Sequence, residues 1–97
     1  MVGPEDLLKQ RRQEILQLAA RHGAKNVRVF GSMARGEAGP DSDVDLLVDL
    51  APDRSLLDHV ALQADLEALL GRKVDVVTES ALYWLLKRRI LKEARAL

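Results

Sequence analysis

The sequence has no cysteine, no excess of charge of either sign and no long apolar run. Without cysteine, neither a disulfide nor a thiolate metal site can form. Fifteen basic residues balance fifteen acidic ones. That balance gives no support to a general nucleic-acid binder, because such proteins usually carry a basic excess. No segment approaches the roughly 20 apolar residues of a membrane span, and the N-terminus lacks the apolar stretch of a signal peptide. We therefore expect a cytoplasmic protein with no membrane contact and no direct nucleic-acid partner.

The remaining composition is ordinary for a folded domain. A length of 97 residues, with 47% hydrophobic and 31% charged residues, indicates a single domain over residues 1–97 with one modest core. The charge is uneven, because residues 37–67 hold nine acidic side chains against the single Arg54, and each flank holds seven basic against three acidic. Such a pattern is typical of solvated helix faces, or of an acidic cation-binding centre between basic phosphate-binding or partner-binding surfaces.

The spacing of apolar residues predicts alternating helices and strands. Helices are predicted from Pro4 to about Gly23, from Ser55 to Gly71 and over residues 80–97. Strands are predicted over residues 26–30, 43–50 and 73–78, where apolar and polar residues alternate. The glycine-rich residues 31–42 form a loop between the first two strands, with room for one helical turn. This order predicts a small α/β domain of the α+β type, with a mixed sheet, helices packed on one face and the other face partly open.

The first candidate feature is Gly31-Ser32, directly after a predicted strand. Glycine lets the backbone approach a phosphate closely, and the Ser32 hydroxyl and the N–H groups that follow can donate to phosphate oxygens. A Gly-Ser pair after a strand also occurs in ordinary turns, so alone it is weak evidence. Arg35 could neutralise triphosphate charge, or it could instead pair with Glu37 or Asp41.

The second feature is a set of three aspartates on two predicted strands. In Asp43-x-Asp45 the strand period of two places both carboxylates on one face. Asp75 lies in the same phase on the next strand, so it joins the pair if the strands are neighbours, and it could accept the proton of an attacking hydroxyl. Adjacent carboxylates repel each other, which raises a pKa or demands a divalent cation such as Mg²⁺. Three of them suit a two-ion centre for in-line displacement at phosphorus, although an exposed strand face can also carry acids that have no such role.

These features together resemble the minimal nucleotidyltransferase (MNT) domain of the DNA polymerase β-like nucleotidyltransferase superfamily. The run GSMARGEAGPDSDVDLLV (31–48) carries the specific part of the resemblance, and Val74-Asp75-Val76 extends it. The resemblance covers essentially the whole chain, but it is much less specific after Val77. It implies the polymerase β-like fold and a triphosphate contact from the Gly-Ser pair. It also implies that the Asp-x-Asp carboxylates hold the divalent ions and that the later Asp completes the site. By position these roles fall on Gly31, Ser32, Asp43, Asp45 and Asp75.

The resemblance also implies a partner protein. MNT proteins are typically encoded beside HEPN-domain proteins as toxin–antitoxin pairs, and the MNT antitoxin can neutralise its HEPN ribonuclease by transferring AMP to a tyrosine hydroxyl. We therefore expect an Mg²⁺-dependent nucleotidyltransferase that uses ATP and modifies a HEPN toxin. Two alternatives stay open. One is a non-catalytic antitoxin that neutralises the toxin by binding, and the other is a nucleotidyltransferase subunit for small molecules of the antibiotic type.

Overall fold

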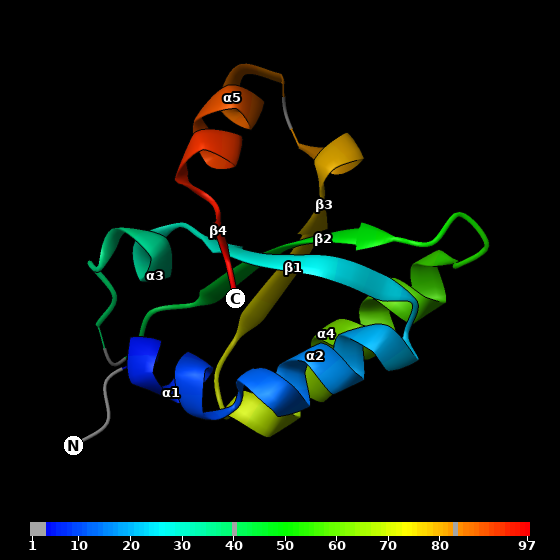
Figure 1. The fold of residues 1–97 in the computed structure, drawn as a ribbon, viewed down its shortest axis with the longest axis horizontal. Helices are drawn as coiled ribbons and strands as arrows, with labels where there is room; N and C mark the ends of the chain where they lie inside the picture. The colour runs from blue at the N-terminus through cyan, green and yellow to red at the C-terminus, as the bar shows by residue number, and fades with distance from the viewer. Residues whose placement is uncertain (1–3, 40, 83) are drawn as a thin grey trace.

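The computed structural model describes residues 4–39, 41–82 and 84–97 (Figure 1). Helices and strands alternate along the chain, as predicted. The elements are α1 (Pro4–Gln10), α2 (Arg12–Arg21), β1 (Ala24–Phe30), α3 (Ser32–Arg35), β2 (Val44–Leu50), α4 (Leu56–Leu70), β3 (Val74–Thr78), the 3₁₀ turn η1 (Glu79–Ala81), α5 (Trp84–Glu93) and β4 (Arg95–Ala96). Within the described part of the chain, no helix is both long and apolar enough to span a bilayer.

The strands form one mixed sheet in the order β3-β2-β1-β4. β1 is antiparallel to both β2 and β4, whereas β2 and β3 are parallel. A parallel pair needs a long crossover connection, and α4 provides it. The mixed sheet with its helices confirms the predicted α+β class.

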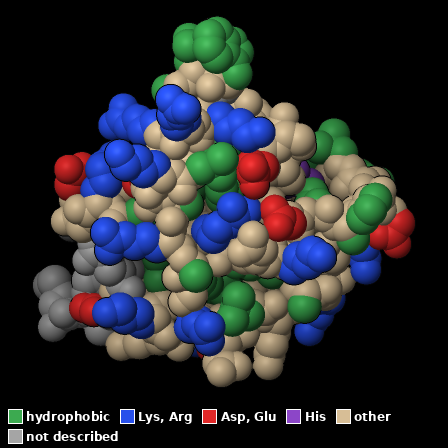
Figure 2. Space-filling model, turned by 45° about the horizontal axis from the view of Figure 1, so that its top comes forward, with side chains coloured by type: hydrophobic (Ala, Val, Ile, Leu, Met, Phe, Trp, Pro, Cys, Tyr) green, Lys and Arg blue, Asp and Glu red, His purple; other side chains and the backbone are tan. Residues whose placement is uncertain are grey.

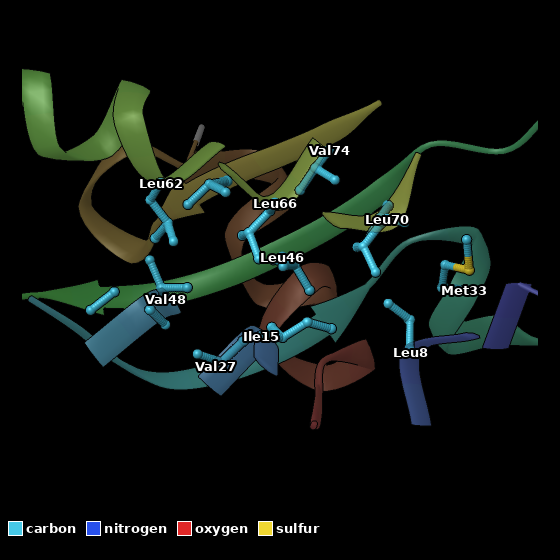
Figure 3. Packing of buried hydrophobic residues seen from close by; sticks show 14 residues of the cluster. Leu8, Ile15, Val27, Met33, Leu46, Val48, Leu62, Leu66, Leu70 and Val74 are labelled. Atoms are coloured by element: carbon cyan, nitrogen blue, oxygen red, sulfur yellow. The ribbon is translucent and has the colours of Figure 1, made fainter. Parts of the chain in front are cut away.

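The core lies between one face of the sheet and helices α2 and α4 (Figures 1 and 3). Alternate residues of β2 and β3 point into it, so the residues between them face the other way. Each fully buried leucine or valine contributes about 1.5–3 kcal/mol relative to an exposed one, which fixes the orientation of both strands. The central members of the core are Ile15, Val44, Leu46, Val48, Leu62, Leu66, Val74 and Val76.

The first predicted helix is interrupted. It divides at Arg11, whose backbone (φ −100°, ψ 10°) departs from helical geometry between α1 and α2. Leu8 and Ile15, on either side of the bend, both lie in the core, with 4% and 0% of their surfaces exposed. The prediction of one continuous helix from Pro4 to about Gly23 was therefore correct in its buried face and wrong in its continuity.

The predicted bounds of the last helix, residues 80–97, were also wrong at both ends. Residues 79–81 form a 3₁₀ turn, and the chain leaves α5 after Glu93 to pair with β1 as the short strand β4. This pairing satisfies backbone groups on the open edge of β1, such as the Val27 carbonyl, which accepts the Leu97 N–H at 3.1 Å. As a result α5 lies on the side of the sheet opposite α2 and α4 (Figure 1), so the helices are not all on one face.

Candidate active site

Two of the predicted aspartates lie side by side on the sheet face opposite the core. The parallel register of β2 and β3 sets Asp45 directly beside Asp75. Their neighbours Val44 and Val74 are fully buried on the other face, so neither carboxylate can turn into the core. Asp43 immediately precedes β2 and is exposed. The structure thus pairs Asp45 with Asp75 and leaves Asp43 at the entrance to the strand.

The surroundings of Asp45 disfavour its ionised form. Partial burial, followed by the negative charges of Asp75 and Asp43, raises the pKa of Asp45 from 3.8 to about 6. The positive charge of Arg35 acts in the opposite direction. The charges of both Asp75 and Asp43 therefore act on Asp45.

The donor chemistry of this group suits a hard divalent cation. Carboxylate oxygens are the ligands that Mg²⁺ prefers, and a bound cation would relieve the repulsion that raises the pKa of Asp45. In the described part of the chain, however, no three acidic or histidine side chains converge tightly enough, in their present conformations, to enclose an ion. The ligand types and the charge of the site fit Mg²⁺. Asp45 and Asp75 already lie side by side, and Asp43 would have to turn toward them.

Gly31 lies directly against the Asp45 carboxylate. Its backbone has φ +73° and ψ −151°, a conformation that side chains rarely adopt, and it follows Phe30, the register partner of Asp45. A Cβ added at Gly31 would overlap Asp45 Oδ2. Glycine is therefore required here for two reasons, and it brings the Gly-Ser loop and the aspartates into one site.

Helix α3 determines which way Ser32 and Arg35 point. Met33 and Ala34 are buried with 5% and 8% exposure, and Ser32 and Arg35 lie more toward the surface. Arg35 donates from Nε to Glu37 at 2.9 Å and from Nη1 to Glu93 at 2.7 Å. Of the two roles considered for Arg35, pairing with Glu37 is therefore present in this structure, and its charge still reaches Asp45.

Glu93 joins the site although sequence reasoning gave it no role. Its Oε2 accepts the Gly31 N–H at 2.8 Å while its Oε1 accepts from Arg35, and its side chain is only 15% exposed. The hydrogen bond from Arg35 is the main cause that lowers the pKa of Glu93. The available signal was that Glu93 is the one acid among five basic residues of segment 80–97.

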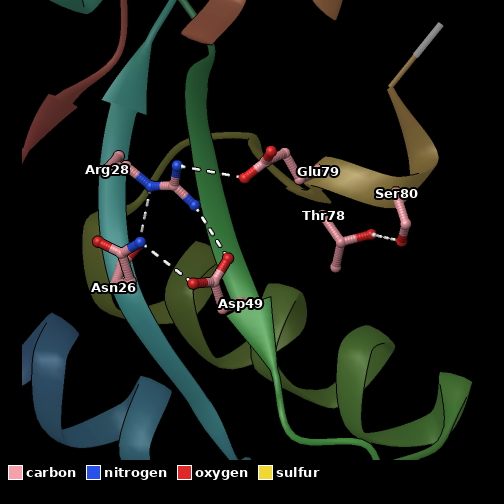
Figure 4. A network of polar contacts seen from close by, with 6 residues as sticks. All are labelled: Asn26, Arg28, Asp49, Thr78, Glu79 and Ser80. Carbon is pink, nitrogen blue, oxygen red and sulfur yellow. Dashed lines mark hydrogen bonds and ion pairs between the residues drawn. The ribbon is translucent and has the colours of Figure 1, made fainter. Parts of the chain in front are cut away.

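Asp49 shares a strand and an alternation phase with Asp45 but belongs to a different group (Figure 4). Arg28 Nη2 and Asn26 Nδ2 each donate to it at 3.1 Å, and Arg28 Nη1 lies 3.7 Å from Glu79. Asp49, whose side chain is 39% exposed, is held in this network at the far end of β2, away from Asp75.

The aspartates occupy an open part of the surface. A hollow of about 390 Å³ lies beside α3, between α1 and β4, with Arg35 and Arg95 among its lining residues. None of the three aspartates lines it, so this hollow does not hold a second substrate against the carboxylates.

This chain is similar to known nucleotidyltransferases in sequence. The family model described as "Nucleotidyltransferase domain" matches residues 8–97. The protein adenylyltransferase MntA of Thermococcus cleftensis is 47% identical over 77 residues, which cover 79% of this chain and 78% of that protein.

Two solved structures share the fold. A chain assigned as a minimal nucleotidyltransferase superposes with a TM-score of 0.86 at 53% identity, covering 96% of this chain and 95% of its own. A toxin–antitoxin structure with AMP-PNP has a TM-score of 0.74 at 21% identity, covering 87% and 69%. At that identity the second likeness concerns the fold alone.

Proposed function

Because this chain belongs to the nucleotidyltransferase domain family, we propose that it transfers AMP from ATP to a hydroxyl group of a partner protein in the presence of Mg²⁺. One observation carries the proposal. The Gly31 backbone lies against the Asp45 carboxylate, which lies beside Asp75. A phosphate-binding loop and a set of cation-binding acids therefore adjoin on one accessible face.

The proposed role of each residue follows from its chemistry. Gly31 and Ser32 bind phosphate oxygens, and Arg35 offsets triphosphate charge. Asp43, Asp45 and Asp75 hold the divalent ions. When bound there, Mg²⁺ supplies charge neutralisation at the attacking and leaving oxygens.

The transfer itself is a displacement at phosphorus. The acceptor hydroxyl oxygen forms a bond to the α-phosphorus while the bond from that phosphorus to the bridging oxygen breaks, and pyrophosphate leaves. Asp75 accepts the hydroxyl proton. The chain's own contribution is to hold the hydroxyl oxygen, the α-phosphorus and the bridging oxygen in line, with the Asp75 carboxylate near the hydroxyl proton.

A protein acceptor is supported by the exposed apolar surface of the chain. Large hydrophobic side chains are exposed in two groups, at the start of α4 and in the first turn of α5, and grouped exposed apolar side chains mark protein-interaction surfaces. Figure 2 shows hydrophobic side chains at the tip of the molecule and Lys and Arg side chains gathered below them. The residues, with 49–80% of their surfaces exposed, are Leu56, Leu57, Val60, Trp84, Leu85 and Leu86.

We further propose that the partner is a HEPN-domain toxin and that this chain is its antitoxin, with a tyrosine hydroxyl as acceptor. The relative from Thermococcus cleftensis is named a protein adenylyltransferase, which indicates a protein acceptor. A structure with the same fold was solved as a toxin–antitoxin complex with AMP-PNP. The three carboxylates lie outside the hollow beside α3 and Asp43 is exposed, which fits an acceptor that a second protein presents.

The direct test is the intact mass of the proposed HEPN-domain partner, which we expect to be encoded by the neighbouring reading frame. After incubation with the chain, ATP and Mg²⁺, its mass is expected to rise by one or more AMP units, and peptide mapping should place them on tyrosine. Chelation of the divalent ion by EDTA should prevent the rise. If the two proteins form a complex that silences the ribonuclease while its mass stays unchanged, neutralisation is by binding and the catalytic proposal is wrong.

A further inference from the structure

One carboxylate occupies two of the donors that a triphosphate would use. Glu93 Oε2 accepts the Gly31 N–H at 2.8 Å, and Glu93 Oε1 accepts from Arg35 Nη1 at 2.7 Å. The two contacts come from opposite ends of the same loop, so Glu93 bridges it in the way that an anionic ligand would. The Glu93 side chain is 15% exposed and that of Arg35 is 38% exposed, so the bond from Gly31 is the more enclosed of the two contacts.

We propose that Glu93 is a built-in competitor of the triphosphate, which must displace it from Gly31 and Arg35 before the nucleotide can bind. This inference rests on the proposed function, because it takes the Gly31–Arg35 loop as the triphosphate site. Glu93 lies outside the Gly-Ser and Asp-x-Asp motifs, in the C-terminal segment. Binding of the nucleotide would therefore also affect that segment.

Charge makes simultaneous occupancy unfavourable. A triphosphate brings several negative charges to a loop that already faces Asp45, and Glu93 adds another at the same donors. A single N–H can serve one strong acceptor well, and charge-assisted bonds from arginine and backbone amides are among the strongest in proteins. The Gly31 N–H is therefore available either to Glu93 or to a phosphate oxygen.

The segment that carries Glu93 can move at small cost. None of the ten side chains of α5 is fully buried, so few apolar contacts hold the helix. Beyond Glu93, the segment is held by the two-residue pairing of β4 with β1, by the Leu97 N–H bond to the Val27 carbonyl and by the bond from Arg12 Nε to the Leu97 carbonyl. Displacement of Glu93 is therefore expected to loosen α5 and β4 together.

The test compares binding of Mg²⁺–AMP-PNP to the wild-type chain and to Glu93→Gln by calorimetry. Glutamine keeps the shape but removes the competing charge, so we expect Glu93→Gln to bind about tenfold more tightly. Glu37→Gln is the matched control, because it removes the other carboxylate on Arg35, at 2.9 Å, but makes no contact with Gly31. The control is expected to change affinity by less than about threefold.

Hydrogen exchange provides a second measurement that does not depend on the variant. In the wild-type chain, AMP-PNP with Mg²⁺ should accelerate amide exchange in residues 84–97 while protecting the Gly31–Arg35 loop. An affinity of Glu93→Gln equal to or weaker than wild type would overturn the inference, since Glu93 would then support the loop. Slower exchange over residues 84–97 would do the same. Absence of binding by both proteins would remove the proposed function as well, whereas equal binding by both removes this inference alone.

Discussion

Replacement of Asp45 by asparagine is expected to abolish nucleotidyl transfer and, at the same time, to make the protein more stable. Asp45 is the carboxylate that adjoins both Asp75 and Gly31, so its loss removes a cation ligand from the centre of the site. Loss of about 4 kcal/mol of transition-state stabilisation corresponds to roughly a thousandfold slower transfer. The measurement is label transfer from α-³²P-ATP to the partner protein.

The gain in stability follows from the sign of the pKa shift. Because the pKa of Asp45 is raised from 3.8 to about 6 in the folded chain, ionisation of Asp45 costs the folded state more than the unfolded one. The cost is absent below about pH 4, grows as the pH rises toward 6 and is complete above it. Asparagine avoids it, so at pH 7 and without divalent ions Asp45→Asn should be more stable by about 1 kcal/mol, allowing for solvent screening.

Thermal unfolding checks this prediction, with an expected rise in Tm of about 5 °C at pH 7 and little difference at pH 4. Added Mg²⁺ with nucleotide should raise the Tm of the wild type and reverse the order. Asp49→Asn is the matched control, because Asp49 lies on the same strand and face but pairs with Arg28 at 3.1 Å. Transfer by Asp45→Asn at the rate of Asp49→Asn would contradict the role assigned to Asp45.

Gly31→Ala is expected to damage the site more than the fold. Alanine at φ +73° and ψ −151° costs about 1–3 kcal/mol of backbone strain, and its Cβ would overlap Asp45 Oδ2, so the carboxylate must move. A displacement of this size in a positioned catalytic group lowers the rate by about a hundredfold. The measurements are the free energy of unfolding in urea and the rate of AMP transfer.

Gly71→Ala separates strain from displacement of Asp45. Gly71 ends α4 at φ +68°, and a Cβ there would meet open space. Gly71 has the left-handed helical conformation (ψ 26°), which alanine tolerates better than the Gly31 conformation, so Gly71→Ala should lose less backbone stability and transfer AMP at close to the wild-type rate. If the two variants lose activity equally, the contact of Gly31 with Asp45 has no special part in the reaction.

The sequence predicted those parts of the site that depend on local pattern. Period-two alternation in residues 43–50 and 73–78 gave the correct face for Asp45 and Asp75, because burial of Leu46, Val48 and Val76 determines it. That the two strands are neighbours was a condition of the prediction, and the parallel register of β2 and β3 meets it. The resemblance to the minimal nucleotidyltransferases is confirmed by the family match over residues 8–97.

The features that the sequence did not predict depend on long-range pairing. Residues 95–96 continue a helical pattern but become β4, because the edge of β1 offers them hydrogen-bond partners. The contact of Glu93 with Gly31 spans 62 residues and has no local signal beyond its isolation among basic residues.

The central claim is that Asp43, Asp45 and Asp75 share divalent ions beside the Gly31–Ser32 turn. Anomalous diffraction from a crystal grown with Mn²⁺ and AMP-PNP tests it most directly, because Mn²⁺ takes oxygen ligands and has a measurable anomalous signal. The account predicts strong peaks between the three carboxylates and the phosphates, with ions about 3.5–4 Å apart if two are bound. Clear density for bound nucleotide with no anomalous peak at these carboxylates would contradict it.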